Sequence, residues 1–495
     1  MSRVIARILL PTFALAISFY GASAVAAAPP PQIRYLDTDT AAAGSFVGIY
    51  GSGFGDPSSS TKVLVDTVAV TEVKLWTDTA IIFRVPTGAK TGVVKVSPAS
   101  GQTLSSDAAL KIISGDIYVV APNGSDTDKG SEAQPFRTIH RALSAATAGS
   151  TVLVRGGTYD EKDSLAPTAP AFFVRSAQSG TVDAPITIRG FGTDVPVLSG
   201  STTTASNDSI LALGGSHLRL ARLEINGSSN KGDAVAVMGS DIWLSAMDVH
   251  GFGARGIFVA DASSTVTISG SQIHDGGSTS PNDHALFLTG QSLLVRDNLI
   301  SNLPSGFGIM LAYQSESKAE IFANRISNAA SGGIGFDRVA GGNQVYNNVL
   351  SNVGTSSING CRCALQVSFG ANSGENSTGD KIHHNTFYGP TESAVRISDR
   401  SGKVELNSNI FANFAAGVLV EDTVSTTVLT SSNNLWQANG ATLKFRWDST
   451  VSEFAAFQSS SKQEAASIVA DPQFVNAKTW DFHLQGSSPA IDHGS

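Results

Sequence analysis

The sequence predicts an all-β protein in which a small β-sandwich precedes a parallel β-helix. The first observation is a phrase that recurs between about residues 218 and 436: an apolar residue, two variable residues, asparagine, a variable residue and an apolar residue. A fixed period in the twenties predicts a solenoid. The asparagines stand 26, 24, 37, 24 and 25 residues apart, at Asn298, Asn324, Asn348, Asn385, Asn409 and Asn434.

The segments between the asparagines indicate the kind of solenoid. About ten residues after each asparagine comes a short apolar segment of period two, such as Gly308–Leu311 or Gly417–Val420, which is typical of a strand. The remaining space holds no helix of ten residues, so helical repeats are excluded and stacked parallel strands remain. We interpret the asparagines as structural corner residues that tolerate awkward backbone angles and hydrogen-bond their copies in adjacent turns.

Residues 32–113 are predicted to form the sandwich, because short apolar strands alternate there with turns. The stretch Ala43–Phe54, with its Gly-Ser-Gly-Phe corner, resembles the IPT/TIG family of immunoglobulin-like modules, as do Ala80–Pro86 and Thr91–Val96. The resemblance implies a module that positions or binds, and the segment contains no catalytic constellation.

Residues 115–495 are assigned to the β-helix. A strand at Ile117–Val120 is followed by Phe136, Ile139, Ala142, Leu143 and Ala146 on one helical face, which predicts an amphipathic helix across the open end of the solenoid. The phrases Val120–Ser125, Gln134–Ile139, Val154–Tyr159 and Ala184–Arg189 resemble the opening of right-handed parallel β-helix proteins of the pectate-lyase-like superfamily. They come closest to the branch that contains the family 9 polysaccharide lyases.

This resemblance implies a right-handed coil with substrate along its outer face. For family 9 lyases it also implies Ca²⁺ that neutralises a uronate and a lysine that takes the C5 proton. The chain departs from that pattern, since only Lys231 and Lys318 lie near the groove and neither is on a strand face. An arginine or histidine base is the chemical alternative, because β-elimination needs a base, carboxylate neutralisation and a proton for the leaving oxygen.

Composition and targeting signals limit the partners. Residues 1–28 read as a secretory leader, with Arg3 and Arg7 before an apolar stretch and small residues at the cleavage site, so we expect a secreted, periplasmic or cell-surface protein. No other long apolar run follows, which predicts no membrane span. The net charge of −8 without a basic run argues against nucleic acid. We expect a monomer that binds extracellular polysaccharide.

Three groups of residues are candidates for chemistry. In the first, Asp283 and His284 with Arg255 one turn below form a catalytic proton-transfer site near the substrate-binding Tyr313, because histidine titrates near neutral pH and arginine holds a carboxylate through two hydrogen bonds. The alternative is that His284 hydrogen-bonds the backbone at a corner.

The second group is a candidate metal site. Asp399 and Asp422 occupy equivalent positions on adjacent turns, roughly 5 Å apart by strand spacing. With Asp337 they are candidate Ca²⁺ ligands, unless the carboxylates splay into solvent.

The third group is a cationic patch. It consists of Arg396, a further catalytic candidate, and three predicted substrate-binding arginines, Arg338, Arg362 and Arg400. Alternatively these arginines pair with Asp337 and Asp399 on the surface.

Two further features carry predictions. The outward middle row of the second strands is predicted to contain Ala236, Phe258, Phe287, Met310, Gly335, Gln366, Arg396 and Leu419. Its large apolar members are either a sugar-stacking platform or a patch covered by loops or the module, and we favour the covered patch. The pair Cys361 and Cys363 leaves open a strained disulfide, two free thiols or half of a metal site.

The sequence therefore predicts a secreted protein that binds an acidic polysaccharide and cleaves it by β-elimination. Hydrolysis or epimerisation on the same scaffold is the nearest enzymatic alternative. A non-catalytic surface or matrix protein that binds glycan or spaces the module is the alternative from another class.

Overall fold

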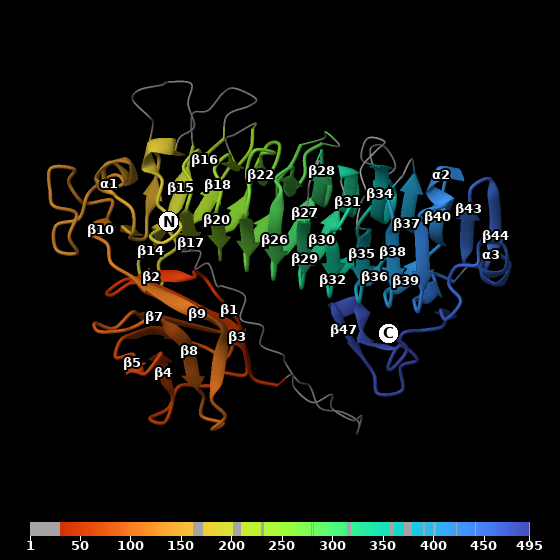
Figure 1. Cartoon of the computed structure of the whole chain (residues 1–495), viewed down its shortest axis with the longest axis horizontal. Coiled ribbons are helices and arrows are strands. Elements are labelled where there is room, and N and C mark those ends of the chain that lie inside the picture. The colour runs from red at the N-terminus through yellow and green to blue at the C-terminus, as the bar shows by residue number, and fades with distance from the viewer. Residues whose placement is uncertain are drawn as a thin grey trace, which may run out of the picture.

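The computed structural model describes residues 30–494 apart from 162–171, 201–208, 229–231, 279, 281, 314–317, 340, 357–360, 371–378, 390–391, 399–401, 422 and 441. The predicted leader, residues 1–28, lies outside the described residues. The chain forms a small sandwich attached to one end of a long solenoid of strands (Figure 1). No helix within the described ranges is long and apolar enough to cross a membrane.

The sandwich, which we call the module, consists of two sheets around a core of mostly Val, Ile, Leu and Phe side chains. The four-stranded sheet has the order β1 (Gln32–Leu36), β3 (Phe46–Ser52), β7 (Ala80–Arg84) and β6 (Val73–Trp76). The five-stranded sheet has the order β2 (Thr40–Ala42), β9 (Leu104–Ile113), β8 (Gly92–Ser97), β4 (Lys62–Val65) and β5 (Val68–Ala69).

The solenoid is a β-helix of three twelve-stranded sheets, and between its two ends each turn of the chain adds one short parallel strand to each sheet. Sheet 1 contains β10 (Ile117–Val120), β11 (Thr151–Val154), β14 (Ile186–Gly190), β17 (Leu218–Ala221), β20 (Ile242–Ser245), β23 (Val266–Ser269), β26 (Ser292–Arg296), β29 (Lys318–Phe322), β32 (Gln344–Tyr346), β35 (Asp380–His383), β38 (Val404–Asn407) and β41 (Leu429–Ser432). Sheet 2 contains β12 (Thr158–Tyr159), β15 (Val197–Ser199), β18 (Glu224–Asn226), β21 (Asp248–His250), β24 (Gln272–His274), β27 (Leu299–Leu303), β30 (Arg325–Ala329), β33 (Val349–Ser351), β36 (Thr386–Tyr388), β39 (Ile410–Phe414), β42 (Leu435–Ala438) and β45 (Ile468–Val469). Sheet 3 contains β13 (Phe172–Val174), β16 (Leu211–Leu213), β19 (Val235–Val237), β22 (Ile257–Val259), β25 (Leu286–Leu288), β28 (Phe307–Ala312), β31 (Gly332–Val339), β34 (Cys363–Gly370), β37 (Ser393–Ser398), β40 (Ala416–Val420), β43 (Lys444–Trp447) and β44 (Thr450–Glu453). At the far end, β44 runs antiparallel to β43.

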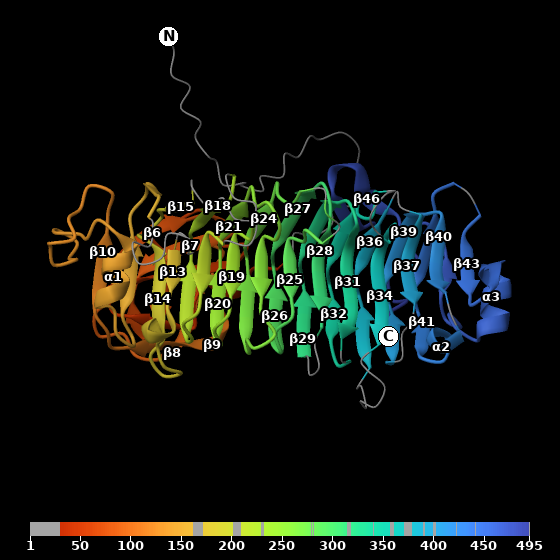
Figure 2. The same cartoon turned by 90° about the horizontal axis from the view of Figure 1, so that it is seen from above.

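The predicted all-β fold is confirmed, and the core lies inside the coil. Strands such as β22 and β25 bury their first and third side chains and leave the middle one half-exposed, as period two requires. Successive turns place like residues on top of one another: Phe387 stacks on Phe411 at 4.8 Å between ring centroids, and Phe411 on Trp436 at 4.2 Å. Figure 2 shows the strands running side by side along the whole length.

The asparagines form one continuous buried ladder. The Nδ2 of each donates to the Oδ1 of the next at 2.9 to 3.1 Å, and each backbone N–H up to Asn409 also donates to that oxygen. The prediction of a structural corner ladder is therefore confirmed. One detail differs: the left-handed backbone angle belongs to the residue before the asparagine, for example Asp297 at φ 58° and Ala323 at φ 55°.

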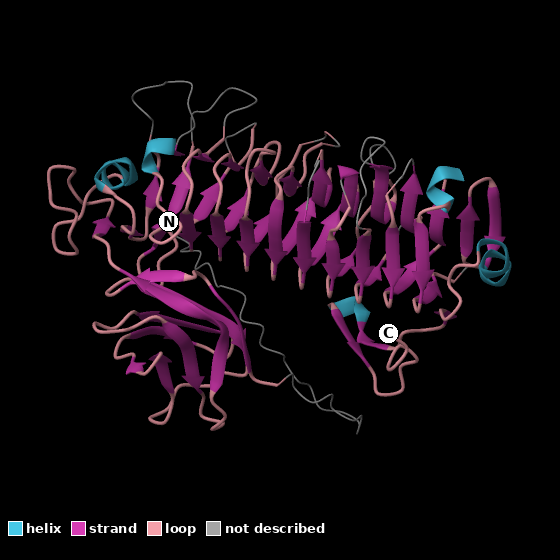
Figure 3. Cartoon of the chain, viewed as in Figure 1, coloured by secondary structure: helices cyan, strands magenta, loops and turns pink. Residues whose placement is uncertain are grey.

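Helices close the two ends of the solenoid (Figure 3). At the start, α1 (Ile139–Ala145) buries Ile139, Ala142 and Leu143, and its N-terminal Thr138 side chain accepts a hydrogen bond from the N–H of Arg141. This agrees with the predicted amphipathic cap. At the far end, α3 (Phe454–Ser461) places Phe457 against Phe445 at 4.8 Å between centroids, a cap that the sequence did not reveal. The shorter helical segments are α2 (Thr423–Thr426), the 3-10 helix at Ser176–Gln178 and that at Ala477–Thr479.

A buried glutamate ends the asparagine ladder. Glu464 has no exposed surface, and its carboxylate accepts hydrogen bonds from the hydroxyls of Ser431 and Ser467 and from the Nδ2 of Asn434. Burial raises the pKa of this carboxyl above its ordinary value.

The module docks on sheet 1. Arg189 of β14 binds both carboxylate oxygens of Asp37 at 3.0 and 3.2 Å, with both side chains fully buried. One turn further on, Arg219 of β17 binds Asp39 at 2.7 and 3.1 Å. An apolar cluster that includes Phe46 of the module and Leu153 of β11 completes the contact.

The C-terminal hairpin covers part of sheet 2. Strands β46 (Phe474–Asn476) and β47 (Asp481–Leu484) place Phe474 and Phe482 against Tyr388 of β36. In Figure 1 the module and this hairpin both lie below the solenoid, whereas β28, β31, β34 and β37 of sheet 3 run along its upper edge. Sheet 3 is therefore the face that neither of them covers.

Candidate functional site

The outer face of sheet 3 carries a continuous middle row of side chains, one from each turn. Strand pairing confirms the predicted row and extends it at both ends. In order, it contains Phe173, Ala212, Ala236, Phe258, Phe287, Met310, Gly335, Gln366, Arg396, Leu419 and Arg446. The row is apolar up to Met310, and beyond Gly335 it is polar except for Leu419.

The apolar half of the row is mostly covered. The guanidinium of Arg255 lies 4.1 Å from the ring centroid of Phe258, and Met310 is only 8% exposed. Met310 packs in a cluster with Phe307 and the two cysteines. The covered patch that we favoured is thus present, but the cover comes from these side chains and not from the module.

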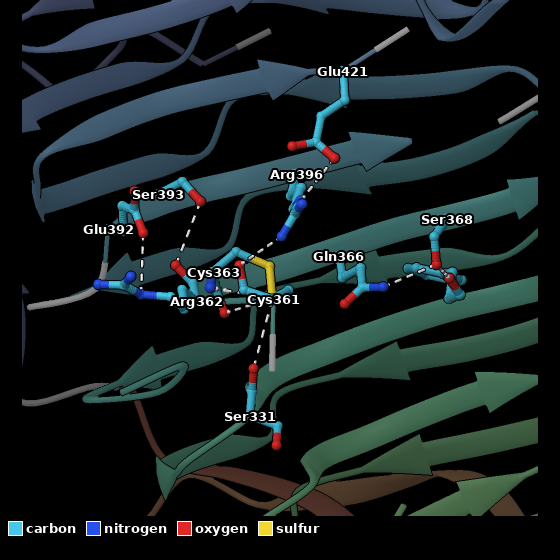
Figure 4. Close-up of a disulfide and its surroundings, with 11 residues drawn as sticks. Ser331, Cys361, Arg362, Cys363, Gln366, Ser368, Glu392, Ser393, Arg396 and Glu421 are labelled. Atoms are coloured by element: carbon cyan, nitrogen blue, oxygen red, sulfur yellow. Dashed lines mark hydrogen bonds and ion pairs between the residues drawn. A yellow bond between two sulfur atoms is a disulfide. The ribbon is translucent and has the colours of Figure 1, made fainter. Parts of the chain in front are cut away.

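Cys361 and Cys363 form a disulfide bond, which decides between the three alternatives left open by the sequence (Figure 4). The bond lies over the middle of sheet 3. The Nη1 of Arg396 donates to the carbonyl oxygen of Cys361 at 3.5 Å. The disulfide therefore separates the apolar half of the row from the polar half.

The residues of the predicted proton-transfer site, Asp283, His284 and Arg255, lie near one another, but their hydrogen bonds are not those of such a site. His284 is 4% exposed, and its Nδ1 accepts the backbone N–H of Phe307 at 2.9 Å. Burial, reinforced by the positive charge of Arg255, lowers the pKa of His284 to about 3. These contacts support the alternative in which a neutral His284 hydrogen-bonds the corner backbone.

The other members of that group have their own partners. Arg255 makes two hydrogen bonds of 2.7 Å to Asp233, and Asp283 accepts the backbone N–H of Ser278 at 2.9 Å. The ring of Tyr313 faces the guanidinium of Arg338 at 5.1 Å from its centroid, and Tyr313 is 53% exposed. The structure thus links Tyr313 to the arginine patch rather than to His284.

The polar half of the row contains a cluster of two arginines around one carboxylate, and Figure 4 shows one of these arginines, Arg396, directed toward Glu421. The Nε of Arg396 lies 2.9 Å from Glu421, and the Nη1 of Arg446 lies 3.6 Å from its other oxygen. The arginine side chains are 38% and 42% exposed. Among the described residues, Glu421 is the carboxylate that pairs with both guanidinium groups, so the described cluster keeps a net positive charge.

Asp337 lies in the next outward row, beside Ala312 on one side and Ser368 on the other. Its Oδ1 is buried and has no hydrogen-bond partner among the described residues. Burial raises the pKa of this carboxyl, and the neighbouring Arg338, 3.8 Å away, only partly opposes the shift. A carboxylate oxygen in this state is a better proton acceptor than one that is fully solvated.

The remaining predicted residues are placed as follows. Arg362 pairs with Glu392 at 3.1 Å, and both side chains are exposed at the edge of the row. Asp399, Arg400 and Asp422 lie outside the described residues. The structure therefore brings Arg338, Arg362, Arg396 and Asp337 to one face and leaves the predicted pair of aspartates untested.

Comparison with known proteins agrees with this architecture. Residues 117–292 match the family model described as Pel9A-like, right handed beta helix region, and residues 31–112 match the IPT/TIG domain. The chain thus contains a region that matches the Pel9A-like right-handed β-helix and an IPT/TIG domain.

Individual relatives match over shorter stretches. A segment of 89 residues is 39% identical to the uncharacterized protein YwoF of Bacillus subtilis and 35% identical to pectate lyase PEL9 of Emericella nidulans. Each match covers 18% of this chain and 17% or 19% of the relative, so the chain spans less than a fifth of the length of these relatives. The crystal structure of pectate lyase Pel9A is similar over 78% of this chain and 92% of its own, with 16% identity and a TM-score of 0.49.

Calcium is the metal that the resemblance implies for this Pel9A-like β-helix. Among the described residues, no group of three or more His, Cys, Asp or Glu side chains is arranged to hold a metal ion. Asp337 alone does not make a calcium site, because Ca²⁺ takes six to eight oxygen ligands. The described residues do not fit the ion, and no step below is routed through it.

Two residues of the face were missed in the sequence. Arg446 and Lys444 lie on β43 and pair with Leu419 and Ala416 of the preceding turn. The row was followed only as far as Leu419, although Lys444-Phe-Arg-Trp447 has the same period-two pattern. By contrast Lys318, one of the two lysines considered, begins β29 in sheet 1.

Proposed function

We propose that this Pel9A-like protein binds an acidic, uronate-containing polysaccharide along the outer face of sheet 3 and cleaves it by β-elimination. The observation that carries the proposal is the combination, on the face that the module and the hairpin leave uncovered, of the arginine cluster and the half-buried carboxylate of Asp337, whose Oδ1 has no hydrogen-bond partner among the described residues. With its predicted leader, the protein would be exported to reach such a polymer.

The residues have distinct roles in the proposed reaction. Arg396 binds the carboxylate of the reacting uronate and withdraws charge from it, which acidifies the C5 proton, and Arg446, two turns further along, binds the carboxylate of a neighbouring unit. Asp337 takes that proton, the C5–H electrons form the C4–C5 double bond, and the C4–O bond breaks. The leaving oxygen then takes a proton from solvent.

Strand spacing places these groups at a workable distance. Asp337 and Arg396 are two turns apart. Asp337 pairs with Ser368 on the next turn, Ser368 pairs with Ser398 on the turn after that, and Ser398 lies two residues after Arg396 on the same strand. Two turns correspond to about 10 Å along the solenoid. An extended Arg396 side chain directed toward Asp337 covers most of that separation, so its guanidinium and the Asp337 carboxylate would contact neighbouring atoms of one uronate.

The same spacing disfavours hydrolysis by Asp337 and Glu421 acting as a carboxylate pair. Asp337 and Glu421 are three turns apart through Ser368 and Ser398, which is about 14 Å along the solenoid. Glycosidases place their two carboxyl groups about 5 to 9.5 Å apart. Glu421 is also held by its two arginines.

The test is the ultraviolet absorbance of the mature protein incubated with a panel of polyuronates. We expect absorbance to rise as the unsaturated product forms, and Asp337→Asn to lower the rate about 100-fold or more. Asp261→Asn, which changes an exposed aspartate at the end of β22 on the same face, should leave the rate unchanged.

The other outcomes are equally informative. Reducing ends without absorbance would indicate a hydrolase, and neither signal across the panel would favour the glycan-binding or structural alternative. Loss of the absorbance change with EDTA would support the predicted calcium ligands Asp399 and Asp422. If Lys444→Met lost activity while Asp337→Asn retained it, Lys444 would be the base and our assignment would be wrong.

A further inference from the structure

The module contains a cleft between its two sheets, far from sheet 3. It opens between β5 and β6, which are the outermost strands of the five-stranded and four-stranded sheets. Its volume is about 380 Å³, which falls in the range of small-molecule sites. The cleft residues that matter here are Lys62, Val63, Val70, Lys74, Leu75 and Trp76.

The floor of the cleft is apolar, and one aromatic ring is fixed in its wall. Val63 is buried, while Val70 and Trp76 pack against the module core from the cleft side. The indole Nε1 of Trp76 donates a hydrogen bond of 3.1 Å to the carbonyl of Gly55, so the ring is held in place before any ligand arrives. A fixed, partly exposed indole is a surface on which a sugar ring stacks.

The two lysines of the cleft are on opposite sheets, Lys62 on β4 and Lys74 on β6. Lys62 has no ion-pair partner among the described residues. Lys74 lies 2.7 Å from Glu72, and Arg84 bridges Glu72 at 3.0 Å and Glu132 at 3.3 Å, so these two cations are balanced by two carboxylates and Lys62 supplies the positive charge of the cleft. In a chain of net charge −8, this is a local preference for an anion.

We propose that the cleft binds a uronate unit of an acidic glycan, with the sugar ring against Trp76 and the carboxylate between Lys62 and Lys74. The ligand class is the same as in the proposed function, but the site is separate and does not depend on cleavage. It would hold the polymer while sheet 3 acts on it. An extended peptide added to the edge of β6 is the rival occupant.

The test measures binding of a galacturonate trimer to the full mature chain by calorimetry. The background carries Arg396→Met and Arg446→Met, so that binding at sheet 3 is removed. In this background we expect one binding event, weakened about tenfold or more by Lys62→Gln with Lys74→Gln, since each ammonium makes a charged hydrogen bond. Lys90→Gln, an exposed lysine of the same module outside the cleft, is the matched control.

Further variants separate the contributions of the ring and the charge. Trp76→Ala should abolish binding and Trp76→Phe should restore part of it, because phenylalanine keeps a ring for stacking. Trp76→Ala can also disturb folding. If the melting temperature of that variant falls, the double lysine variant is the measurement that tests the proposal. Binding that is unchanged by the lysine pair, or equal for a neutral galactose trimer, would overturn the proposal, as would binding of extended peptides alone. Failure to cleave polyuronates would overturn the proposed function and leave this binding result intact.

Discussion

On sheet 1, Arg189 pairs with Asp37 of the module and both are fully buried, while Arg219 pairs with Asp39 of the module and with Asp241. On sheet 3, Arg396 and Arg446 share Glu421 and remain partly exposed, while Asp337 has one oxygen for which the described part of the chain provides no hydrogen-bond partner. Both faces carry the same residue types in the same repeat. The difference teaches that charged residues on a β-helix indicate a site only where their partners leave them unsatisfied.

The largest expected effect tests whether the sheet 1 pairs are structural. Arg189→Met leaves Asp37 buried without its cation, so we expect the free energy of unfolding to fall by about 3 to 5 kcal/mol. Chemical denaturation measures the loss. Arg338→Met, which removes an arginine that is 55% exposed beside Asp337, should cost less than about 1 kcal/mol. Equal losses for the two variants would remove the distinction between the faces.

The next effect compares a buried with an exposed asparagine ladder. Asn348→Ala leaves the backbone N–H and Nδ2 of Asn324 without an acceptor in the interior, and we expect a loss of about 2 to 4 kcal/mol. Asn352 also donates to a neighbour, Asn328, but at the surface. Asn352→Ala should therefore change stability by less than about 1 kcal/mol, and denaturation of both variants checks the contrast.

The third effect is a dependence of stability on pH that comes from His284. Its pKa is about 3 in the folded protein and near 6.5 in the unfolded chain, so only the unfolded chain gains a proton between these values. Stability from this group is full above pH 6.5 and is lost as the pH falls toward 3. By pH 5 the loss is about 2 kcal/mol.

His284→Asn isolates this contribution, because its side-chain oxygen still accepts the N–H of Phe307 but does not titrate. We expect the difference between wild type and variant to shrink by about 2 kcal/mol from pH 7 to pH 5. Cleavage of polyuronates should be retained. A 100-fold loss of activity in the variant would instead restore His284 to the catalytic group.

The smallest effect concerns the disulfide at the boundary between the two halves of the row. Its loop contains only three residues, so the entropy that it removes from the unfolded chain is small. We expect Cys361→Ser with Cys363→Ser to lower the free energy of unfolding by about 1.5 kcal/mol. Reduction of the wild type should give the same shift in denaturation midpoint, and a much larger one would indicate that the bond also organises the face.

The sequence was sufficient for features that repeat. The spacing of the asparagines predicted the buried ladder, and the period-two segments predicted the register of the middle row down to Gln366 and Arg396. Both follow from local rules, because adjacent turns place equivalent residues next to each other. The amphipathic face from Ile139 to Leu143 likewise predicted the N-terminal cap.

Features that depend on distant partners could not be predicted. Arg189 and Asp37 are 152 residues apart in sequence, and no local pattern links them. Arg255 was placed correctly on sheet 3, but its bond to Asp233 rather than to the Asp283–His284 pair depends on side-chain conformation. The low pKa of His284 arises from burial beneath neighbours that the sequence does not reveal.

The asparagine ladder has a direction. Every side-chain amide points its N–H toward the C-terminus, so the run is a head-to-tail chain of dipoles that strengthen one another. Such a chain needs a donor at its head and an acceptor at its tail, and the N–H of Ser271 and the carboxylate of Glu464 supply them. A turn duplicated within the run would preserve this polarity, whereas one appended after Asn434 would have to move the carboxylate with it. The solenoid can therefore be lengthened by a turn inserted in the middle, whereas a turn added at this end also requires the acceptor carboxylate to move.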